Sequence, residues 1–582
     1  MAAPTIPARL FEQAKQRPSA PAYLVRGSTS WEPTDWATYA ANVRQVAAAL
    51  IESGVESGQV ICILGNNRPE WVEMDLGAMC INAIPAGIYQ TCSPEEIAYI
   101  LNHSEAPIVL VENEAQWAKV NEVRKDLPHL KRIITMRGTS IDDDETQTWD
   151  EFIAAGADAD PSAIDQRVQS LKLGDPATFI YTSGTTGPPK AVMLSHDNLA
   201  WTADTAVEIV GHTDQDTSLS YLPLSHIAEQ MFTLHAPITS GGRVYFAQGI
   251  DQMPENLKEV QPTVFFGVPR VWEKFHAGIA AKLKLATGAK LKLVNFARGV
   301  GAEVTARKNE GKPVNGLLAI KYRLANKLIF SKLKPAIGMG NARICVSGAA
   351  PIAPDVLEFM GTLDLSILEV YGQSEGSGPT TFNVPGRTRF GTVGSRLTGI
   401  DVKIAEDGEI LVKGRNVFMG YSKDKDATDA TLDKDGWLYS GDLGAFSDDG
   451  FLTITGRKKD IIITAGGKNI APKNIEAALM EHEAISQAVV IGDRRKFLSA
   501  VVAINPERAA ESGGNLEGFT ESIQKHVDAI NKRFARVEHV RKFSILPREL
   551  DQENGELTPT MKIKRRIVND NWADTIDAMY AD

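Results

Sequence analysis

Short apolar runs alternate with segments of helical periodicity from about residue 35 to about residue 450. The apolar runs are rich in β-branched side chains and lie at 60–64, 108–111, 264–266 and 344–346. Strands of this kind that alternate with amphipathic helices are typical of helices packed on largely parallel sheets. The hydrophobic pattern therefore predicts an α/β protein.

A different pattern follows near residue 400. Apolar runs at 402–404, 409–412 and 451–454 lie between Asp-Gly turns, which predicts a small antiparallel β region. After Gly456, the charged junction Arg457-Lys-Lys-Asp460 leads into a fresh strand. Because 582 residues exceed one typical hydrophobic core, we place a domain boundary at this junction. We expect a large N-terminal domain, 1–456, and a small α+β C-terminal domain, 457–582.

Composition narrows the class of protein. The chain is 43% hydrophobic and 23% charged, and its net charge of −11 argues against nucleic acid as the main partner. The four cysteines (Cys62, Cys80, Cys92 and Cys345) show no CxxC pairing, so we expect buried, reduced thiols. We see neither a signal peptide nor an apolar run of about 18 residues, and therefore expect a cytoplasmic protein.

The positive charge is concentrated in one segment. Residues 271–335 hold 14 Lys and Arg against 3 Asp and Glu, and lysine and leucine interleave at 281–285 and 290–294. This segment could contact an anionic membrane at its inner face as a peripheral element. The alternative is a solvated helical face, which is how most charge runs are used.

The most informative stretch is Tyr181-Thr-Ser-Gly-Thr-Thr-Gly-Pro-Pro-Lys190, which follows an apolar strand at 177–180. Glycines let the backbone approach an anion closely, hydroxyls and amides donate to it, and lysine supplies a point charge. The stretch is therefore typical of a phosphate-binding loop. It is not a Walker motif, because Pro189 stands where that motif has glycine before its lysine. A flexible polar loop is the alternative.

Six further blocks follow this loop in a fixed order. They are Tyr221-Leu-Pro-Leu-Ser-His-Ile-Ala-Glu229, Val346-Ser-Gly-Ala-Ala-Pro351, Tyr371-Gly-Gln-Ser-Glu375, Tyr439-Ser-Gly-Asp442, Gly456-Arg-Lys-Lys-Asp460 and Thr558-Pro-Thr-Met-Lys562. In this order they resemble the blocks of the adenylate-forming superfamily, and the resemblance extends from Thr178 to Arg566. Within the superfamily the chain is most similar to the long-chain fatty acyl-CoA synthetases. The resemblance implies activation of a long-chain fatty acid by ATP and Mg²⁺ to acyl-AMP. Pyrophosphate leaves in this first step. Transfer of the acyl group to CoA then releases AMP.

The resemblance also implies roles for charged and hydroxyl side chains. Glu375 would coordinate Mg²⁺, and Lys562 would contact the α-phosphate and the acyl carboxylate; both could instead be ordinary solvated charges. His226 would lie beside the acyl carboxylate, with a hydrogen-bonded loop histidine as the alternative. The β- and γ-phosphates would be held by Thr182, Ser183, Gly184, Thr185, Thr186 and Lys190.

A further set would bind the nucleoside. Tyr371 would stack on adenine, Asp442 would accept from the ribose hydroxyls, and Arg457 would donate nearby. A core aromatic and a turn aspartate are the alternatives for Tyr371 and Asp442. Ser374 stands where most relatives carry threonine and keeps the hydroxyl. The rest of the adenine site would be formed by Gly348, Ala349, Ala350, Pro351, Gly372 and Gln373.

In the superfamily, the C-terminal domain swings about a hinge between the two half-reactions. Lys459 occupies the hinge position, and Gly467 would leave room for the pantetheine arm of CoA. The block at 264–274 and the long insertion after it resemble long-chain enzymes, and Phe265, Phe266 and Gly267 are expected to border an acyl channel.

Three alternatives remain open from the sequence. The same chemistry could act on another bulky acid, such as an aryl, bile or sterol acid, or could load a carrier protein. A non-catalytic acyl-adenylate-binding protein is the alternative from another class. The sequence leaves open the acyl chain length, the oligomeric state and the site of the CoA nucleotide.

Overall fold

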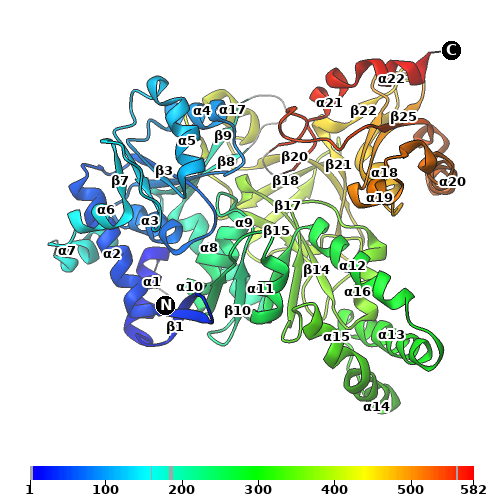
Figure 1. Cartoon of the computed structure of the whole chain (residues 1–582), viewed down its shortest axis with the longest axis horizontal. Coiled ribbons are helices and arrows are strands. Elements are labelled where there is room, and N and C mark those ends of the chain that lie inside the picture. Colours follow the sequence, from blue (N-terminus) through cyan, green and yellow to red (C-terminus); the bar gives the residue numbers. More distant parts are fainter. Residues whose placement is uncertain (1–3, 159, 183–187, 559–560, 582) are drawn as a thin grey trace.

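The computed structural model describes residues 4–158, 160–182, 188–558 and 561–581, and Figure 1 shows their arrangement. The predicted phosphate-loop residues Ser183, Gly184, Thr185 and Thr186 lie outside these ranges.

The largest sheet has eight strands in the order β19-β9-β8-β4-β3-β5-β6-β7. The pairs that join β8, β4, β3, β5, β6 and β7 are parallel, whereas β9 pairs antiparallel with β8 and with β19. The apolar runs at 60–64 and 108–111 are two of the central strands, as predicted. The strands are β3 (Val60–Leu64), β4 (Ile84–Ile88), β5 (Ile108–Val111), β6 (Arg132–Thr135), β7 (Thr146–Thr148), β8 (Pro176–Thr182), β9 (Lys190–Ser195) and β19 (Gly420–Tyr421).

Two smaller sheets continue the N-terminal region. One has the order β12-β13-β14-β15-β16, and its first three strands are parallel. The other has the order β10-β11-β1-β2. Their strands are β1 (Pro21–Arg26), β2 (Trp31–Asp35), β10 (Thr217–Ser220), β11 (Arg243–Phe246), β12 (Val264–Gly267), β13 (Ile344–Ser347), β14 (Ile367–Gln373), β15 (Gly378–Phe382) and β16 (Ser395–Arg396).

The predicted antiparallel region is confirmed as a sheet with the order β17-β18-β20-β21. Its strands are β17 (Ile400–Ile404), β18 (Glu409–Gly414), β20 (Leu438–Phe446) and β21 (Leu452–Arg457). The sheet stands beside the C-terminal region in Figure 1, so the ends of β20 and β21 face that region.

Helices cover the N-terminal sheets, and local sequence fixes several of their ends. Helix α4, for example, begins with a reciprocal cap in which the Ser93 hydroxyl accepts from the Glu96 amide and the Glu96 carboxylate accepts from the Ser93 amide. The helices are α1 (Ile6–Gln16), α2 (Trp36–Glu52), α3 (Pro69–Cys80), α4 (Pro94–Ser104), α5 (Glu114–Glu122), α6 (Trp149–Ala155), α7 (Pro161–Ser170), α8 (His196–Val210), α9 (Ile227–Gln230), α10 (Ala236–Ser240), α11 (Met253–Val260), α16 (Pro354–Thr362) and α17 (Lys425–Thr431).

The basic segment forms a helical insert between β12 and β13. It consists of α12 (Pro269–Lys284), α13 (Gly288–Asn309), α14 (Gly316–Ala325), the π-helical turn η3 (Asn326–Phe330) and α15 (Ser331–Ala336). The buried Asp364 carboxylate ties the insert to the body, because it accepts from Lys308, Lys334 and the Tyr322 hydroxyl.

The C-terminal region has hydrophobic clusters of its own, whose buried members lie between Ile462 and Met579. It is built on the sheet β24-β25-β26 and the two-stranded sheet β22-β23. Its elements are β22 (Ile462–Ile463), β23 (Asn469–Ile470), α18 (Pro472–Leu479), β24 (Ile485–Ile491), β25 (Leu498–Ile504), α19 (Pro506–Glu511), α20 (Thr520–Asn531), β26 (Val540–Leu546), α21 (Arg565–Asn571) and α22 (Ala573–Tyr580).

The expected fold class is confirmed: a large α/β N-terminal region with a small β region precedes a smaller α+β C-terminal region. All four cysteines are buried and free. None of the helices in the described part of the chain combines the length and the apolar character needed to cross a bilayer.

Candidate active site

A cavity of about 1280 Å³ opens where the N-terminal sheets meet the C-terminal region. Most of the predicted site residues that the structure describes line it. They are Thr182, Lys190, His226, Ala349, Ala350, Pro351, Tyr371, Gly372, Gln373, Ser374, Glu375, Asp442, Arg457, Lys459 and Lys562. Residues more than 300 positions apart in the sequence therefore share one space.

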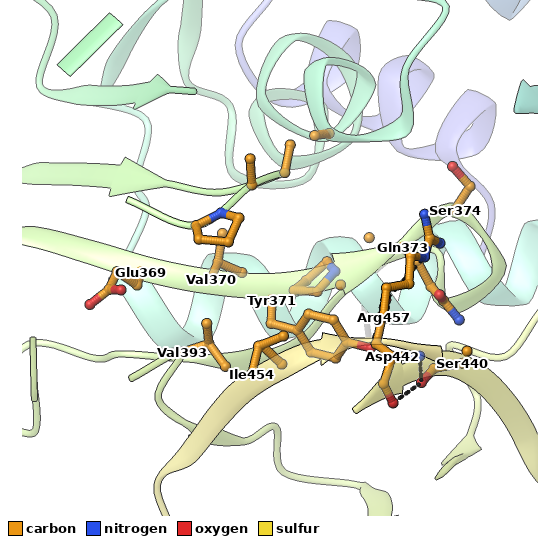
Figure 2. A pocket seen from close by; sticks show the side chains of 18 of the residues that line it. Glu369, Val370, Tyr371, Gln373, Ser374, Val393, Ser440, Asp442, Ile454 and Arg457 are labelled. Carbon is orange, nitrogen blue, oxygen red and sulfur yellow. Dashed lines mark hydrogen bonds and ion pairs between the residues drawn. The ribbon is translucent and has the colours of Figure 1, made fainter. Parts of the chain in front are cut away.

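Strands β14, β20 and β21 form the wall that carries Tyr371, Asp442 and Arg457. The Tyr371 hydroxyl donates to Asp442 Oδ2 at 2.9 Å, and Arg457 Nε lies 3.2 Å from Asp442 Oδ1. Asp442 and Arg457 are directly opposite each other in the antiparallel register of β20 and β21, which fixes the ion pair. Figure 2 shows the Tyr371 ring directed towards Asp442, with Arg457 beside the same carboxylate.

Burial raises the pKa of Asp442, while Arg457 and the Tyr371 hydroxyl act in the opposite direction. Each carboxylate oxygen has a second acceptor site beyond the bond to its partner. A ligand that presents neighbouring hydroxyl groups to this edge of the cavity could therefore donate to both oxygens.

Glu369 also lines this wall, and we did not predict it. It precedes Tyr371 by two positions on β14, and in Figure 2 it lies at the far end of the labelled side chains, pointing away from Asp442. Its carboxyl accepts from the Gly391 amide at 3.0 Å, and burial raises its pKa to about 8. The cavity wall thus includes a carboxyl group that is neutral at pH 7.

Glu375 follows β14 in the short 3-10 turn η4 (Ser374–Gly376). Its Oε1 accepts from the Tyr421 hydroxyl at 2.8 Å. Within the described part of the chain no hydrogen bond or ion pair involves the other oxygen, Oε2, and Glu375 lines the cavity. Among the described residues no group of three or more histidine, cysteine, aspartate or glutamate side chains forms a metal cage. A lone carboxylate suits Mg²⁺ that arrives with phosphate oxygens and waters as its other ligands.

Lys190 begins β9 directly after the predicted phosphate loop. Its Nζ lies 3.7 Å from Asp424 Oδ2 and 4.9 Å from the centre of the Tyr421 ring. Sequence reasoning missed Tyr421 and Asp424. The signal was weak, because Gly420 and Tyr421 form a two-residue strand whose pairing with β9 is visible only in the folded chain.

His226 is the N-cap of α9, and its Nδ1 accepts from the Ala228 amide at 3.1 Å. The neutral ring therefore carries its proton on Nε2. Burial and, to a smaller extent, the nearby Lys562 ammonium together lower the pKa of His226 to about 4. At neutral pH this side chain is an uncharged hydrogen-bond donor in the cavity wall.

Lys562 reaches the cavity from the C-terminal region. Its amide donates to the Thr558 hydroxyl, and the Thr558 amide donates to the Lys562 carbonyl, which fixes the turn between them. Pro559 and Thr560 of this block lie outside the described residues. Loss of solvent around the ammonium lowers the pKa of Lys562, as do Arg457 and Lys473, whereas Asp442 and Glu375 raise it. Lys473 on α18 is a further cation in the lining, and the sequence did not suggest it.

Two predicted glycines lie outside the cavity lining. Gly348 packs against β14, where an added Cβ would lie 2.6 Å from Val370 Cγ1, so its small size serves packing. Gly467 is exposed at the turn between β22 and β23 with φ +71°, a backbone region that favours glycine. Neither residue contributes to the lining in this arrangement.

Gly372 and Ala349 show how tightly the lining is built. A Cβ on Gly372 would lie 1.7 Å from the Gly378 carbonyl oxygen, so no other residue fits. Ala349 lines the cavity with φ +68°, a backbone conformation that is uncommon for a residue with a side chain.

Part of the cavity lining is apolar. The apolar side chains come from the end of α8, from the segment at 227–236 and from β12. They are Ala206, Ile209, Val210, Ile227, Ala228, Met231, Phe232, Ala236, Val264 and Phe266. Phe265 and Gly267, which we also expected there, do not line it. Strand alternation turns Phe265 to the other face, where it stacks on Tyr221 with ring centres 5.6 Å apart.

Comparison with known proteins agrees with this architecture. A family described as AMP-binding enzyme matches residues 10–422, and one described as AMP-binding enzyme C-terminal domain matches residues 459–582. The Long-chain-fatty-acid–CoA ligase ACSBG2 of Xenopus laevis is 39% identical over 95% of this chain and 80% of its own length. The Long-chain-fatty-acid–CoA ligase FadD15 of Mycobacterium bovis is 35% identical over 99% of this chain and 97% of its own.

Among solved structures, the adenylation domain of a carboxylate reductase from Mycobacterium chelonae superposes with a TM-score of 0.79. It is 19% identical in sequence, and the match covers 99% of this chain and 91% of that one, which shows a shared fold. The resemblance read from the sequence blocks is thereby confirmed, and the chain belongs to the AMP-binding enzyme family.

Proposed function

We propose that this protein is an AMP-forming long-chain fatty acid–CoA ligase that uses ATP and Mg²⁺. The full-length relatives that carry this activity in their names support the proposal. The observation that carries it is one cavity whose lining includes Asp442, Tyr371 and Arg457, a lysine from the C-terminal region and a set of apolar side chains. One space can therefore hold a nucleotide and an acyl chain end to end.

The nucleotide is proposed to lie along β14. Asp442 accepts from the two ribose hydroxyls, Tyr371 provides a flat apolar face for adenine, and Arg457 holds the carboxylate in place. Ala349, Ala350 and Pro351 provide small side chains along the base. The phosphates extend towards Lys190, and the loop at 183–187 is proposed to cradle them.

Magnesium is proposed to reach this site with ATP. Glu375 would hold it through the carboxylate oxygen that Tyr421 does not occupy. When bound, the ion supplies positive charge to the phosphate oxygens. The proposed tasks of Lys190 and Lys562 are separate from this, since each adds a cation of its own to the cavity lining.

Adenylation joins a fatty carboxylate to the α-phosphorus. A carboxylate oxygen forms the new P–O bond, and the bond to pyrophosphate breaks, so the pyrophosphate carries away the electron pair. The reactants repel each other because both are anionic. Lys562 would offset this repulsion, and the His226 Nε2–H would donate to the acyl carboxyl group.

Thioester formation follows at the same carbonyl carbon. The CoA thiol gives up its proton to solvent, its sulfur forms a C–S bond, the C–O bond to AMP breaks, and AMP leaves with the electron pair. Lys562 and an incoming thiol compete for the same approach, so we propose that the region after residue 456 swings about Lys459 between the steps. Gly467 would then face the acyl-adenylate.

The proposal is tested by pyrophosphate exchange with purified protein, ATP and Mg²⁺ over a panel of acids, with and without CoA. We expect exchange with long-chain fatty acids and acyl-CoA formation when CoA is added. Exchange only with aryl, bile or sterol acids would change the substrate class. Exchange without thioester formation would indicate that the acyl group is transferred to a carrier protein and not to CoA. Absence of exchange with every acid would refute the proposal that this protein is an acid-activating enzyme.

A further inference from the structure

The helical insert carries exposed apolar side chains in a line along α14. Leu317, Ile320 and Leu324 are 67%, 64% and 48% exposed, although all three are apolar. Their spacing of three and four residues places them on one side of the helix. Single exposed leucines are common on protein surfaces, but a line of three on one helix face is not.

This exposed line is not needed to hold α14 in place. The opposite side of the helix already packs on α13, through Leu318 and Ala325, which are buried together with Val300 and Val304. The Tyr322 hydroxyl adds a hydrogen bond to Asp364. Helix α14 therefore has two apolar sides, and among the described residues one of them packs on α13 while the other is exposed.

Basic side chains border the unused side. Residues 311–335 contain six lysine and arginine residues and no aspartate or glutamate. Lys321, Arg323 and Lys327 are exposed, and within the described part of the chain they form no ion pair, in contrast to Lys308 and Lys334, which bind Asp364. The rest of the protein is strongly acidic, so the insert carries the opposite charge to the surface around it.

The position of α14 leaves this side accessible. In Figure 1, α13 and α14 extend from the lower edge of the molecule, on the side opposite to α21 and α22. A further exposed apolar side chain of the insert, Leu285, lies at the turn between α12 and α13 and is 81% exposed, with Lys282 and Lys284 close by in sequence. A flat partner could reach the edge of the insert without approaching the C-terminal region.

From these observations we propose that the exposed side of α14 is a docking surface for an anionic lipid bilayer, with Leu317, Ile320 and Leu324 entering the interface and the lysines and arginine contacting headgroups. Apolar burial and attraction to anionic lipids add in such helices. A second copy of this chain fits less well, because a symmetric contact would bring two basic, acid-free segments together. The proposal is independent of the ligase reaction.

The test is flotation of the full-length protein with two kinds of vesicle: pure phosphatidylcholine, and phosphatidylcholine with about one-third phosphatidylglycerol. We expect binding to the anionic vesicles that weakens as salt rises. The triple variant Leu317→Ser, Ile320→Ser, Leu324→Ser should lose at least about tenfold in binding, and Lys321→Glu, Arg323→Glu, Lys327→Glu a similar amount.

The matched control is Ile250→Ser, because Ile250 is 60% exposed but lies outside the insert; it should bind as the unchanged protein does. The melting temperature should stay unchanged in all variants, which shows that they fold. Three outcomes would overturn the proposal. They are absence of binding by the unchanged protein, equal binding by the apolar triple variant, and a dimer in solution that the triple variant dissociates.

Discussion

The substitution Asp442→Asn tests the proposed ribose contact most directly. Asparagine has nearly the same shape, and its carbonyl oxygen can still accept from the Tyr371 hydroxyl at the position of Oδ2. The negative charge and one acceptor oxygen are lost. The ion pair with Arg457 is lost too, but the Arg457 side chain is 42% exposed, so water compensates for most of that change.

The magnitude follows from the hydrogen bonds. A hydrogen bond to a charged group contributes about 1.5–3 kcal/mol, and each 1.4 kcal/mol changes a binding constant about tenfold. The loss of one such bond to the ribose should therefore raise the KM for ATP by between about tenfold and about a hundredfold. Because the ribose takes no part in bond breaking, kcat should change much less.

The assay is pyrophosphate exchange as a function of ATP concentration, at saturating Mg²⁺ and fatty acid. Tyr371→Phe is the matched control, because it removes the other partner of Oδ2 and keeps the aromatic ring. Its effect on the KM for ATP should be smaller than that of Asp442→Asn, because the Tyr371 hydroxyl contacts Asp442 and both acceptor oxygens of Asp442 remain. An Asp442→Asn protein of unchanged melting temperature and unchanged KM for ATP would remove Asp442 from the nucleotide site.

Three further substitutions test other parts of the site and the core. Lys562→Met should lower pyrophosphate exchange by at least about 100-fold and spare thioester formation from added acyl-adenylate; equal loss in both steps would argue against a role confined to adenylation. Glu375→Gln should raise the Mg²⁺ concentration for half-maximal exchange, and an unchanged Mg²⁺ dependence would exclude Glu375 as a ligand. Burial raises the pKa of Glu229 to about 7. The unfolded chain releases this proton above pH 4.5 and the folded chain above about pH 7, so unfolding free energy falls by up to about 3 kcal/mol across that window. In denaturant titrations at pH 5 and pH 7.5, the unfolding free energy of Glu229→Gln should fall less between the two pH values than that of the unchanged protein. An equal fall in both proteins would contradict the raised pKa of Glu229.

The sequence predicted the strands well because buried strands of parallel sheets are continuous apolar runs. The run at 60–64 is β3, and every side chain in it is buried. The same property explains the error at 265–267. A run that is apolar at every position carries no alternation, so it cannot show which side chains face the cavity. Only the fold shows that Phe266 lines the cavity and that Phe265 packs on Tyr221.

The residues that sequence reasoning missed depend on long-range contacts. Tyr421 holds Glu375, and Asp424 approaches Lys190, yet the two pairs are separated by 46 and more than 200 positions. No local pattern marks a tyrosine or aspartate for such a contact. Gly348 shows the reverse case: we assigned it to the nucleotide site from its block, whereas its close approach to Val370 gives it a packing role.

The placement of Lys562 and Gly467 explains why one C-terminal region would have to serve two steps in turn. Strands β24 and β25 form a sheet with a hydrophobic cluster on each face. The hairpin that carries Gly467 packs on one face through Ile462 and Ile470, and the segment of Lys562 packs on the other through Leu557 and Ile563. Lys562 lines the cavity in this arrangement and Gly467 does not. A rotation that turned Gly467 towards the cavity would carry Lys562 away, because the two segments are joined through the same sheet. The lysine proposed to assist adenylation would thus leave as the thiol arrives, which makes the two half-reactions exclusive and requires acyl-adenylate to form before CoA reacts.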